Sequence, residues 1–182
     1  MEKKTFFQQM KDGTQIAVIR WLPDCDEKDI KGIIQISHGM VEHASRYERF
    51  AQYITQSGYI VSAHDHRGHG DTAVRAEQDG TGKRGFLADK NGFLTVVEDL
   101  REVLLKVKAD YPDKEVILFA HSFGSFVGQA FIELYGGLIQ KCILCGTAGP
   151  RHLLIYTGLA VTFIGKTLLG KKRTAHFIND AF

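Results

Sequence analysis

Residues 116–134 predict a buried strand, a tight turn with a serine at its tip and a helix, in that order. Ser122 stands at the turn, and two small residues, Ala120 and Gly124, lie two positions before and two positions after it. Both must be small because the helix packs back over the strand, where a bulky side chain would collide. The segment therefore predicts a serine hydroxyl that projects freely from a strained bend.

Two interpretations of Ser122 remain open from this segment alone. In the first, the serine is a nucleophile, and the strand, turn and helix form a nucleophile elbow. In the second, the serine caps the N-terminus of the helix that follows it, as serines commonly do. The rest of the chain favours the first interpretation.

Strands and helices alternate along most of the chain. Asp12-Gly13 is a dipeptide typical of hairpin turns, and it joins predicted strands at 5–10 and 14–21. The apolar patterns then predict strands at 32–37, 59–63, 116–120 and 141–146, helices at 47–54, 93–107 and 123–134, and a long functional loop at 64–92. This order predicts an α/β fold with a mostly parallel sheet, an N-terminal hairpin and flanking helices.

Composition narrows the class of protein. The chain has 182 residues, 44% of them hydrophobic, which is enough for a buried core. A formal net charge of +2 and the absence of a basic block argue against nucleic acid as a partner. The start of the chain lacks an apolar core of signal-peptide length. The three cysteines do not have the spacing of a disulfide framework and fit a reducing compartment, so we expect a cytoplasmic protein.

Three motifs suggest a metal, a redox centre or a cofactor, and each has a simpler interpretation. The histidines in residues 64–70 lack the aspartate that a binuclear metal site would place at Gly68, so we expect no metal. Cys142 and Cys145 form a C-x-x-C on a predicted strand, which favours two core cysteines. Residues 80–85 spell G-x-G-x-x-G without a preceding strand or a following helix, so no dinucleotide cofactor is expected.

The tripeptide His38-Gly39-Met40 ends a predicted parallel strand, at the sheet edge where α/β proteins build their sites. In acyl-transfer enzymes, a loop in this place supplies a backbone N–H to the oxyanion hole. We therefore expect the amides of Met40 and Phe123 to be the two oxyanion-hole donors. An ordinary turn at the end of a strand is the alternative.

Four segments together resemble the monoacylglycerol lipase and lysophospholipase branch of the serine α/β-hydrolases. They are ISHGMVEHASRYERFAQYI, HDHRGHGDTA, GFLADKNGF and AHSFGSF, in that order, and the resemblance covers about residues 4–149. It implies that Ser122 is the nucleophile that forms an acyl-enzyme, that residues 65–70 shape the site without doing chemistry, and that His121 is not the base.

The same resemblance implies a catalytic acid and histidine after Ser122, in the last strands of the sheet. The carboxylates that follow Ser122 are Glu133 and Asp180, and the histidines are His152 and His176. Glu133 is too far along its helix, about 16 Å from the serine, and no histidine follows Asp180. The chain is thus expected to be an α/β-hydrolase core (1–149) with the start of a helical cap (150–182), truncated before the last strands and inactive alone.

The apolar segment 153–165 is too short for a membrane span. As part of a cap it would line an acyl-chain pocket, which favours a small ester or lipid substrate such as a monoacylglycerol or lysophospholipid. Peripheral contact with a membrane surface is a second expectation for this segment. The exposed edge of strand 141–146 predicts self-association. The alternative function is a non-catalytic lipid-binding or regulatory module on the same fold.

Overall fold

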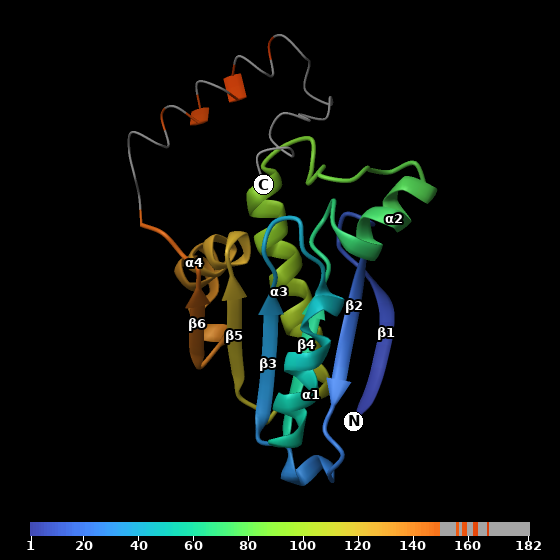
Figure 1. Cartoon of the computed structure of the whole chain (residues 1–182), viewed down its shortest axis with the longest axis vertical. Helices are drawn as coiled ribbons and strands as arrows, with labels where there is room; N and C mark the ends of the chain where they lie inside the picture. The colour runs from blue at the N-terminus through green and yellow to red at the C-terminus, as the bar shows by residue number, and fades with distance from the viewer. Residues whose placement is uncertain (150–155, 157, 160–161, 164–166, 168–182) are drawn as a thin grey trace. The chain divides into compact units, whose positions relative to one another are not determined.

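A computed structural model describes residues 1–149, 156, 158–159, 162–163 and 167. Its described part contains a six-stranded sheet in the order β1-β2-β4-β3-β5-β6. Figure 1 shows the strands side by side, with helices on both faces. The strands are β1 (Glu2–Gln9), β2 (Gln15–Leu22), β3 (Gly32–Ser37), β4 (Tyr59–His64), β5 (Val116–His121) and β6 (Lys141–Cys145). The helices are α1 (Glu48–Gln56), α2 (Gly70–Gln78), α3 (Gly92–Asp110) and α4 (Phe123–Tyr135), with short 3₁₀ turns η1 (Glu27–Asp29), η2 (Ala44–Tyr47) and η3 (Gly136–Leu138).

The sheet confirms the predicted fold class. β1 and β2 form the antiparallel hairpin, and β2 pairs antiparallel with β4. The remaining neighbours, β4-β3, β3-β5 and β5-β6, are parallel. Parallel strands present their carboxyl ends at the same edge, so the segments that follow β3, β4 and β5 meet there.

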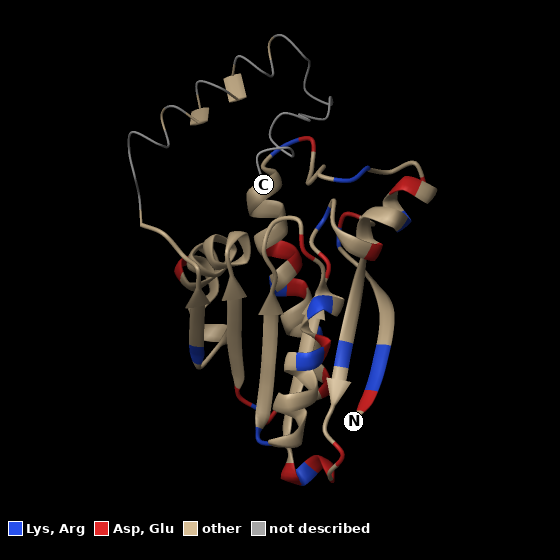
Figure 2. Cartoon of the chain, viewed as in Figure 1, with Lys and Arg blue, Asp and Glu red and all other residues tan. Residues whose placement is uncertain are grey.

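Apolar side chains alternate between the two faces of the sheet and build two core layers. On one face, Ile33 of β3 packs with Leu100 of α3 and Phe131 of α4. On the other face, Ile34 packs with Ala51 of α1. In Figure 2, β3 and β5 carry no charged residue, as expected for strands covered on both faces.

The predicted loop at 64–92 is wrong over residues 70–78, which form α2. This helix buries only two small residues, Thr72 and Ala73, so its sequence lacks the apolar stripe that marks most helices. Its first turn is held from outside the helix, because Asp65 Oδ2 accepts the Asp71 N–H at 2.7 Å. Gly70 is required beside this carboxylate, since a Cβ there would lie 2.1 Å from Asp65 Oδ2.

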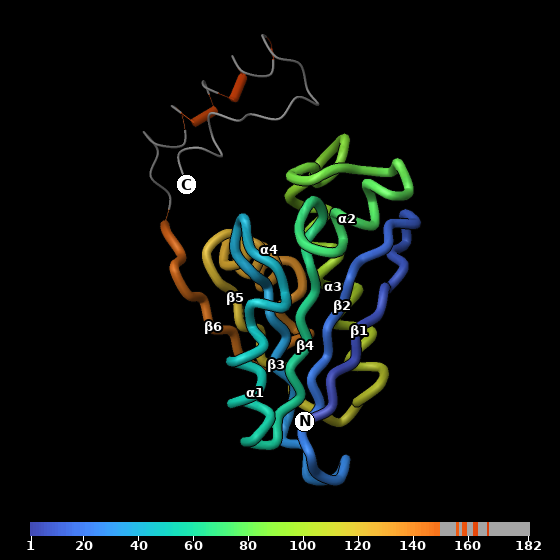
Figure 3. Tube along the Cα trace, turned by 45° about the vertical axis from the view of Figure 1, so that its right-hand side comes forward, coloured from blue at the N-terminus to red at the C-terminus, as the bar shows by residue number. Residues whose placement is uncertain are grey.

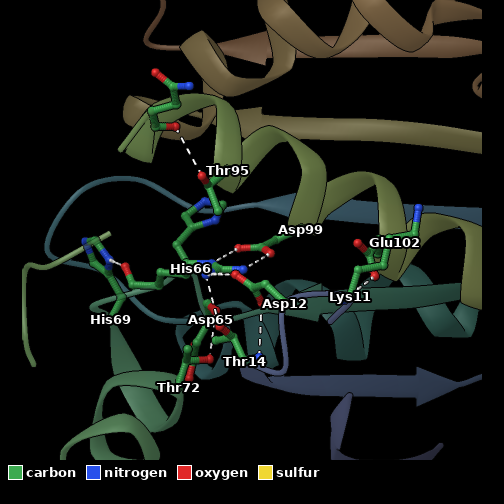
Figure 4. A network of polar contacts seen from close by, with 12 residues as sticks. Lys11, Asp12, Thr14, Asp65, His66, His69, Thr72, Thr95, Asp99 and Glu102 are labelled. Carbon is green, nitrogen blue, oxygen red and sulfur yellow. Dashed lines mark hydrogen bonds and ion pairs between the residues drawn. The ribbon is translucent and has the colours of Figure 1, made fainter. Parts of the chain in front are cut away.

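A buried arginine ties three segments together at this end of the sheet. Arg67 donates from Nε and Nη2 to the two carboxylate oxygens of Asp99 in α3, at 2.6 and 2.8 Å. Its Nη1 donates to Asp12 at 2.6 Å and to Thr14 at 3.0 Å, in the turn between β1 and β2. Figure 4 shows Asp12 and Asp99 near each other, and dashed lines mark the bonds that both carboxylates accept. The polar residues of this loop thus hold the fold together.

Three buried histidines, His38, His64 and His66, contact one another at the ends of β3 and β4. The His66 N–H donates to His38 Nε2 at 3.0 Å, so the proton of His38 is on Nδ1, which donates to the Gly39 carbonyl at 2.7 Å. Burial lowers the pKa of His38 to about 3 and that of His64 to about 4, and it also lowers the pKa of His66 well below its usual range. All three imidazoles are therefore neutral in the folded protein at pH 7.

The chain divides into two compact units, Met1–Thr147 and Ala148–Phe182. The predicted helical cap at 150–182 and the apolar segment 153–165 lie almost entirely outside the described residues, so both remain predictions. Among the helices that are described, none has the length and apolar character needed to cross a membrane.

We predict that Arg67→Met destabilises the fold by about 3–5 kcal/mol, because it leaves the buried Asp99 carboxylate without its partner. The matched control is Arg75→Met, which removes an exposed ion pair with Asp79 and should cost about 0–1 kcal/mol. Urea unfolding at pH 7 measures both values. Equal losses would contradict a structural role for Arg67.

We also predict that acid destabilises the protein through the buried histidines. The unfolded chain takes up protons near pH 6.5 that the folded histidines cannot bind, so stability is complete above that pH and falls as the pH drops toward 4. Each histidine contributes a slope of about 1.4 kcal/mol per pH unit. His64→Leu removes an imidazole whose two nitrogens have no partner among the described residues, and the stability of this variant should fall less steeply with pH. Parallel curves for variant and wild type would contradict this.

The described sheet has β6 at one edge and β1 at the other, as Figures 1 and 3 both show. Ile143 of β6 is 47% exposed, and an apolar edge strand can pair with another chain. We predict that the 182-residue chain self-associates and that Ile143→Lys reduces this. Light scattering at high protein concentration measures the mass, and a monodisperse wild-type monomer would disprove the prediction.

Candidate active site

Ser122 lies at the bend between β5 and α4, in a backbone conformation that residues other than glycine rarely adopt. Its φ is 51° and its ψ is −119°. Three hydrogen bonds hold the bend: the Ser122 N–H donates to the Cys145 carbonyl at 2.9 Å, and the Ser122 carbonyl accepts the N–H and the hydroxyl of Ser125 at 2.8 and 2.6 Å. A conformation of this kind costs about 1–3 kcal/mol and persists only where its surroundings enforce it.

Small residues flank the serine because backbones approach closely there. A Cβ at Gly124 would lie 2.1 Å from the Ser37 carbonyl oxygen and 2.6 Å from that of His38, so any larger residue would push α4 away from the end of β3. Ala120 is buried, and its Cβ faces Gly128 of α4. Strand, turn and helix all lie where the sequence predicts them.

The Ser122 side chain does not cap α4. Ser122 occupies the N-cap position, yet its hydroxyl accepts no hydrogen bond from the helix. The residue is partly exposed, and no described side chain or backbone group bonds to the hydroxyl. The capping interpretation therefore has no support in the geometry, and the hydroxyl is available for chemistry.

The loop after β3 lies against the serine. A Cβ on Gly39 would be 3.1 Å from Ser122 Cβ, so this part of the loop passes in direct contact with the bend. Within the described part of the chain, the backbone N–H groups of Met40 and Phe123 have no hydrogen-bond acceptor. Two unpaired donors on the two segments that meet at Ser122 suit a site where negative charge develops.

Glu42 is a residue of this site that the sequence interpretation did not single out. Its carboxylate accepts the Gly39 N–H at 3.0 Å and the Tyr47 hydroxyl at 3.0 Å. It also lies 3.4 Å from Nδ1 of His121, the residue that precedes the serine. Neither the spacing nor the apolar pattern of the sequence marks Glu42, because its contact with Gly39 depends on an irregular turn and His121 becomes its neighbour only through the fold.

The described residues bring no catalytic base to the serine. No imidazole nitrogen among them hydrogen-bonds to the Ser122 hydroxyl, and the nitrogens of His38 contact the backbone of Gly39 and His66. Glu133 is exposed on α4. The other predicted candidates, His152, His176 and Asp180, lie outside the residues that the structure describes.

The cysteine pair shows no sign of redox or metal chemistry. Cys142 and Cys145 are free and only partly buried, and Cys142 packs against the core cluster beneath α3 and α4. Burial raises the pKa of the Cys142 thiol, whereas a reactive thiol needs a lowered pKa. In the described part of the chain, no three His, Cys, Asp or Glu side chains lie close enough together to hold a metal ion.

Comparison of sequences places this chain in a known family. Residues 28–175 match the family described as serine aminopeptidase, S33. A monoacylglycerol lipase of Mycolicibacterium smegmatis is 34% identical over 140 residues, which are 77% of this chain and 45% of the lipase. A monoglyceride lipase homologue of Monkeypox virus is 33% identical over 146 residues, 78% of this chain and 49% of that protein. The chain thus spans about half the length of these curated relatives.

Solved structures agree with the family. A thermostable carboxyl esterase from Bacillus coagulans superposes with a TM-score of 0.74 at 26% identity, over 98% of this chain and 55% of the esterase. A monoglyceride lipase of Saccharomyces cerevisiae has a TM-score of 0.67 at 17% identity, over 92% of this chain and 54% of the lipase, which supports the fold alone. The chain therefore belongs to the serine aminopeptidase S33 family of α/β-hydrolases.

Proposed function

We propose that the protein is a serine esterase that uses Ser122 as its nucleophile. The observation that carries the proposal is the uncapped Ser122 hydroxyl on a strained bend, beside two unpaired backbone donors. Serine hydrolases need this combination, because the hydroxyl must reach a carbonyl carbon while fixed dipoles face the carbonyl oxygen.

In the proposed reaction, Ser122 Oγ attacks the ester carbonyl while a histidine base accepts its proton. The carbonyl oxygen gains negative charge, and the Met40 and Phe123 amides stabilise it by hydrogen bonds. Loss of one such donor costs about 3–4 kcal/mol of transition-state stabilisation in well-studied cases. The alcohol leaves as an acyl-enzyme forms on Ser122, and water then releases the acid.

The proposed substrates are monoacylglycerols, lysophospholipids or related small esters. Support comes from the names of the relatives, which include monoacylglycerol and monoglyceride lipases, and from the esterase of Bacillus coagulans, whose structure contains glycerol. The three free cysteines fit a cytoplasmic location, which we propose as well.

We further propose that the 182-residue chain alone has little activity. The described residues include the proposed nucleophile and the proposed oxyanion donors, but no base among them contacts the serine. Serine hydrolases that lose triad members keep only about 10³- to 10⁴-fold catalysis over water. The activity test therefore uses the protein at the full length that its gene encodes, and the 182-residue chain is measured as well.

We predict that Ser122→Ala lowers kcat of the full-length protein for a monoacylglycerol by at least about 10³-fold, because no acyl-enzyme can form. Ser57→Ala removes an exposed serine just after α1 and is the matched control, for which kcat should stay unchanged. Titration of the released fatty acid measures turnover. Equal turnover by wild type and Ser122→Ala would reject the proposal, and lipid binding without turnover would favour the non-catalytic module.

A further inference from the structure

The loop between β3 and η2 contains a second strained residue besides Ser122. Val41 has a φ of 58°, in the left-handed region, where a β-branched side chain is a genuine outlier. Its side chain is 76% exposed, so packing around it does not enforce this conformation. Some other contact must hold the loop in place.

Glu42 makes the contacts that can do so. Its side chain is 13% exposed and contacts four groups. Oε2 accepts the Gly39 N–H and the Tyr47 hydroxyl, each at 3.0 Å, while Oε1 lies 3.4 Å from His121 Nδ1 and 3.4 Å from the guanidinium of Arg46. Burial alone would raise the pKa of Glu42, yet the Gly39 and Tyr47 hydrogen bonds hold it below its ordinary value. The group is a carboxylate at pH 7.

The Gly39 amide that Glu42 binds is next to the proposed oxyanion donor. The bond from Gly39 N–H to Glu42 closes the four-residue turn that contains Met40 and strained Val41. His38 Nδ1 donates to the Gly39 carbonyl at 2.7 Å, so both backbone polar groups of Gly39 are occupied, and the carbonyl belongs to the same peptide unit as the Met40 N–H. Of the successive amides at 39 and 40, only that of Met40 is left without an acceptor.

We propose that Glu42 is a positioning residue: by binding the Gly39 amide, it holds the strained turn so that the Met40 N–H faces the reacting carbonyl. The inference rests on the proposed esterase function. It assigns Glu42 no contact with substrate, so its effect should fall on kcat rather than on KM.

The first experiment measures the turn itself and does not depend on activity. Hydrogen exchange of the Gly39 amide is followed by NMR in the 182-residue chain, in wild type and in Glu42→Ala. The proposal expects at least about tenfold faster exchange in the variant, because the acceptor is lost. Unchanged exchange of Gly39 would overturn the proposal.

The second experiment measures monoacylglycerol hydrolysis by the full-length protein. Glu42→Ala should lower kcat by about 10- to 100-fold, less than removal of a donor outright, with KM within about threefold. Glu42→Gln keeps an acceptor oxygen, so its kcat should fall less than that of Glu42→Ala.

Val41→Gly relieves the backbone strain and should recover part of kcat in the Glu42→Ala background. Glu48→Gln, the same change at a nearby carboxylate that pairs with Lys3, is the control and should leave kcat unchanged.

These outcomes separate the inference from the proposed function. A loss confined to KM, or no recovery on adding Val41→Gly, would overturn the positioning role while the esterase remains. If the wild-type protein hydrolyses no ester, the proposed function fails, and Gly39 exchange alone then decides whether Glu42 holds the turn.

Discussion

The close approach of α4 to the end of β3 is the constraint on which the site depends. Gly124 allows it, since even one methyl group there would overlap the Ser37 and His38 carbonyl oxygens. The approach sets Ser122 beside Gly39 and forces the serine backbone into its strained bend, which the Cys145 carbonyl and Ser125 then hold. Strain at Ser122 is thus balanced by contacts from two strands, β3 and β6, and from helix α4.

The polar loop after β4 makes contacts that hold this end of the sheet in place. Arg67 fixes the loop to α3 and to the first hairpin, while His66 binds His38, which in turn binds the Gly39 carbonyl. Histidines that resemble metal ligands in the sequence thus have a structural role: they help to hold the turn that contains Met40. Their burial lowers the histidine pKa values, so this support depends on neutral imidazoles.

The sequence predicts most of the fold because its strands are short apolar runs with clear turn residues. It also predicts the bend at Ser122, since small residues and helical spacing are local signals. It does not reveal α2, whose buried residues are Thr72 and Ala73 and whose first turn is held by the Asp65 carboxylate, outside the usual N-cap position. Glu42 is missed because its contact with Gly39 depends on a strained turn that the sequence does not mark, and because His121 reaches its carboxylate only after β3 and β5 pair.

The central claim is that a free hydroxyl on this bend attacks esters, and covalent labelling tests it most directly. The full-length protein is treated with a fluorophosphonate, digested with trypsin and analysed by mass spectrometry. The account predicts one modified peptide, residues 115–141, with the adduct assigned by fragmentation to Ser122 and not to Ser125. An adduct on another residue, or none on this peptide, would contradict it.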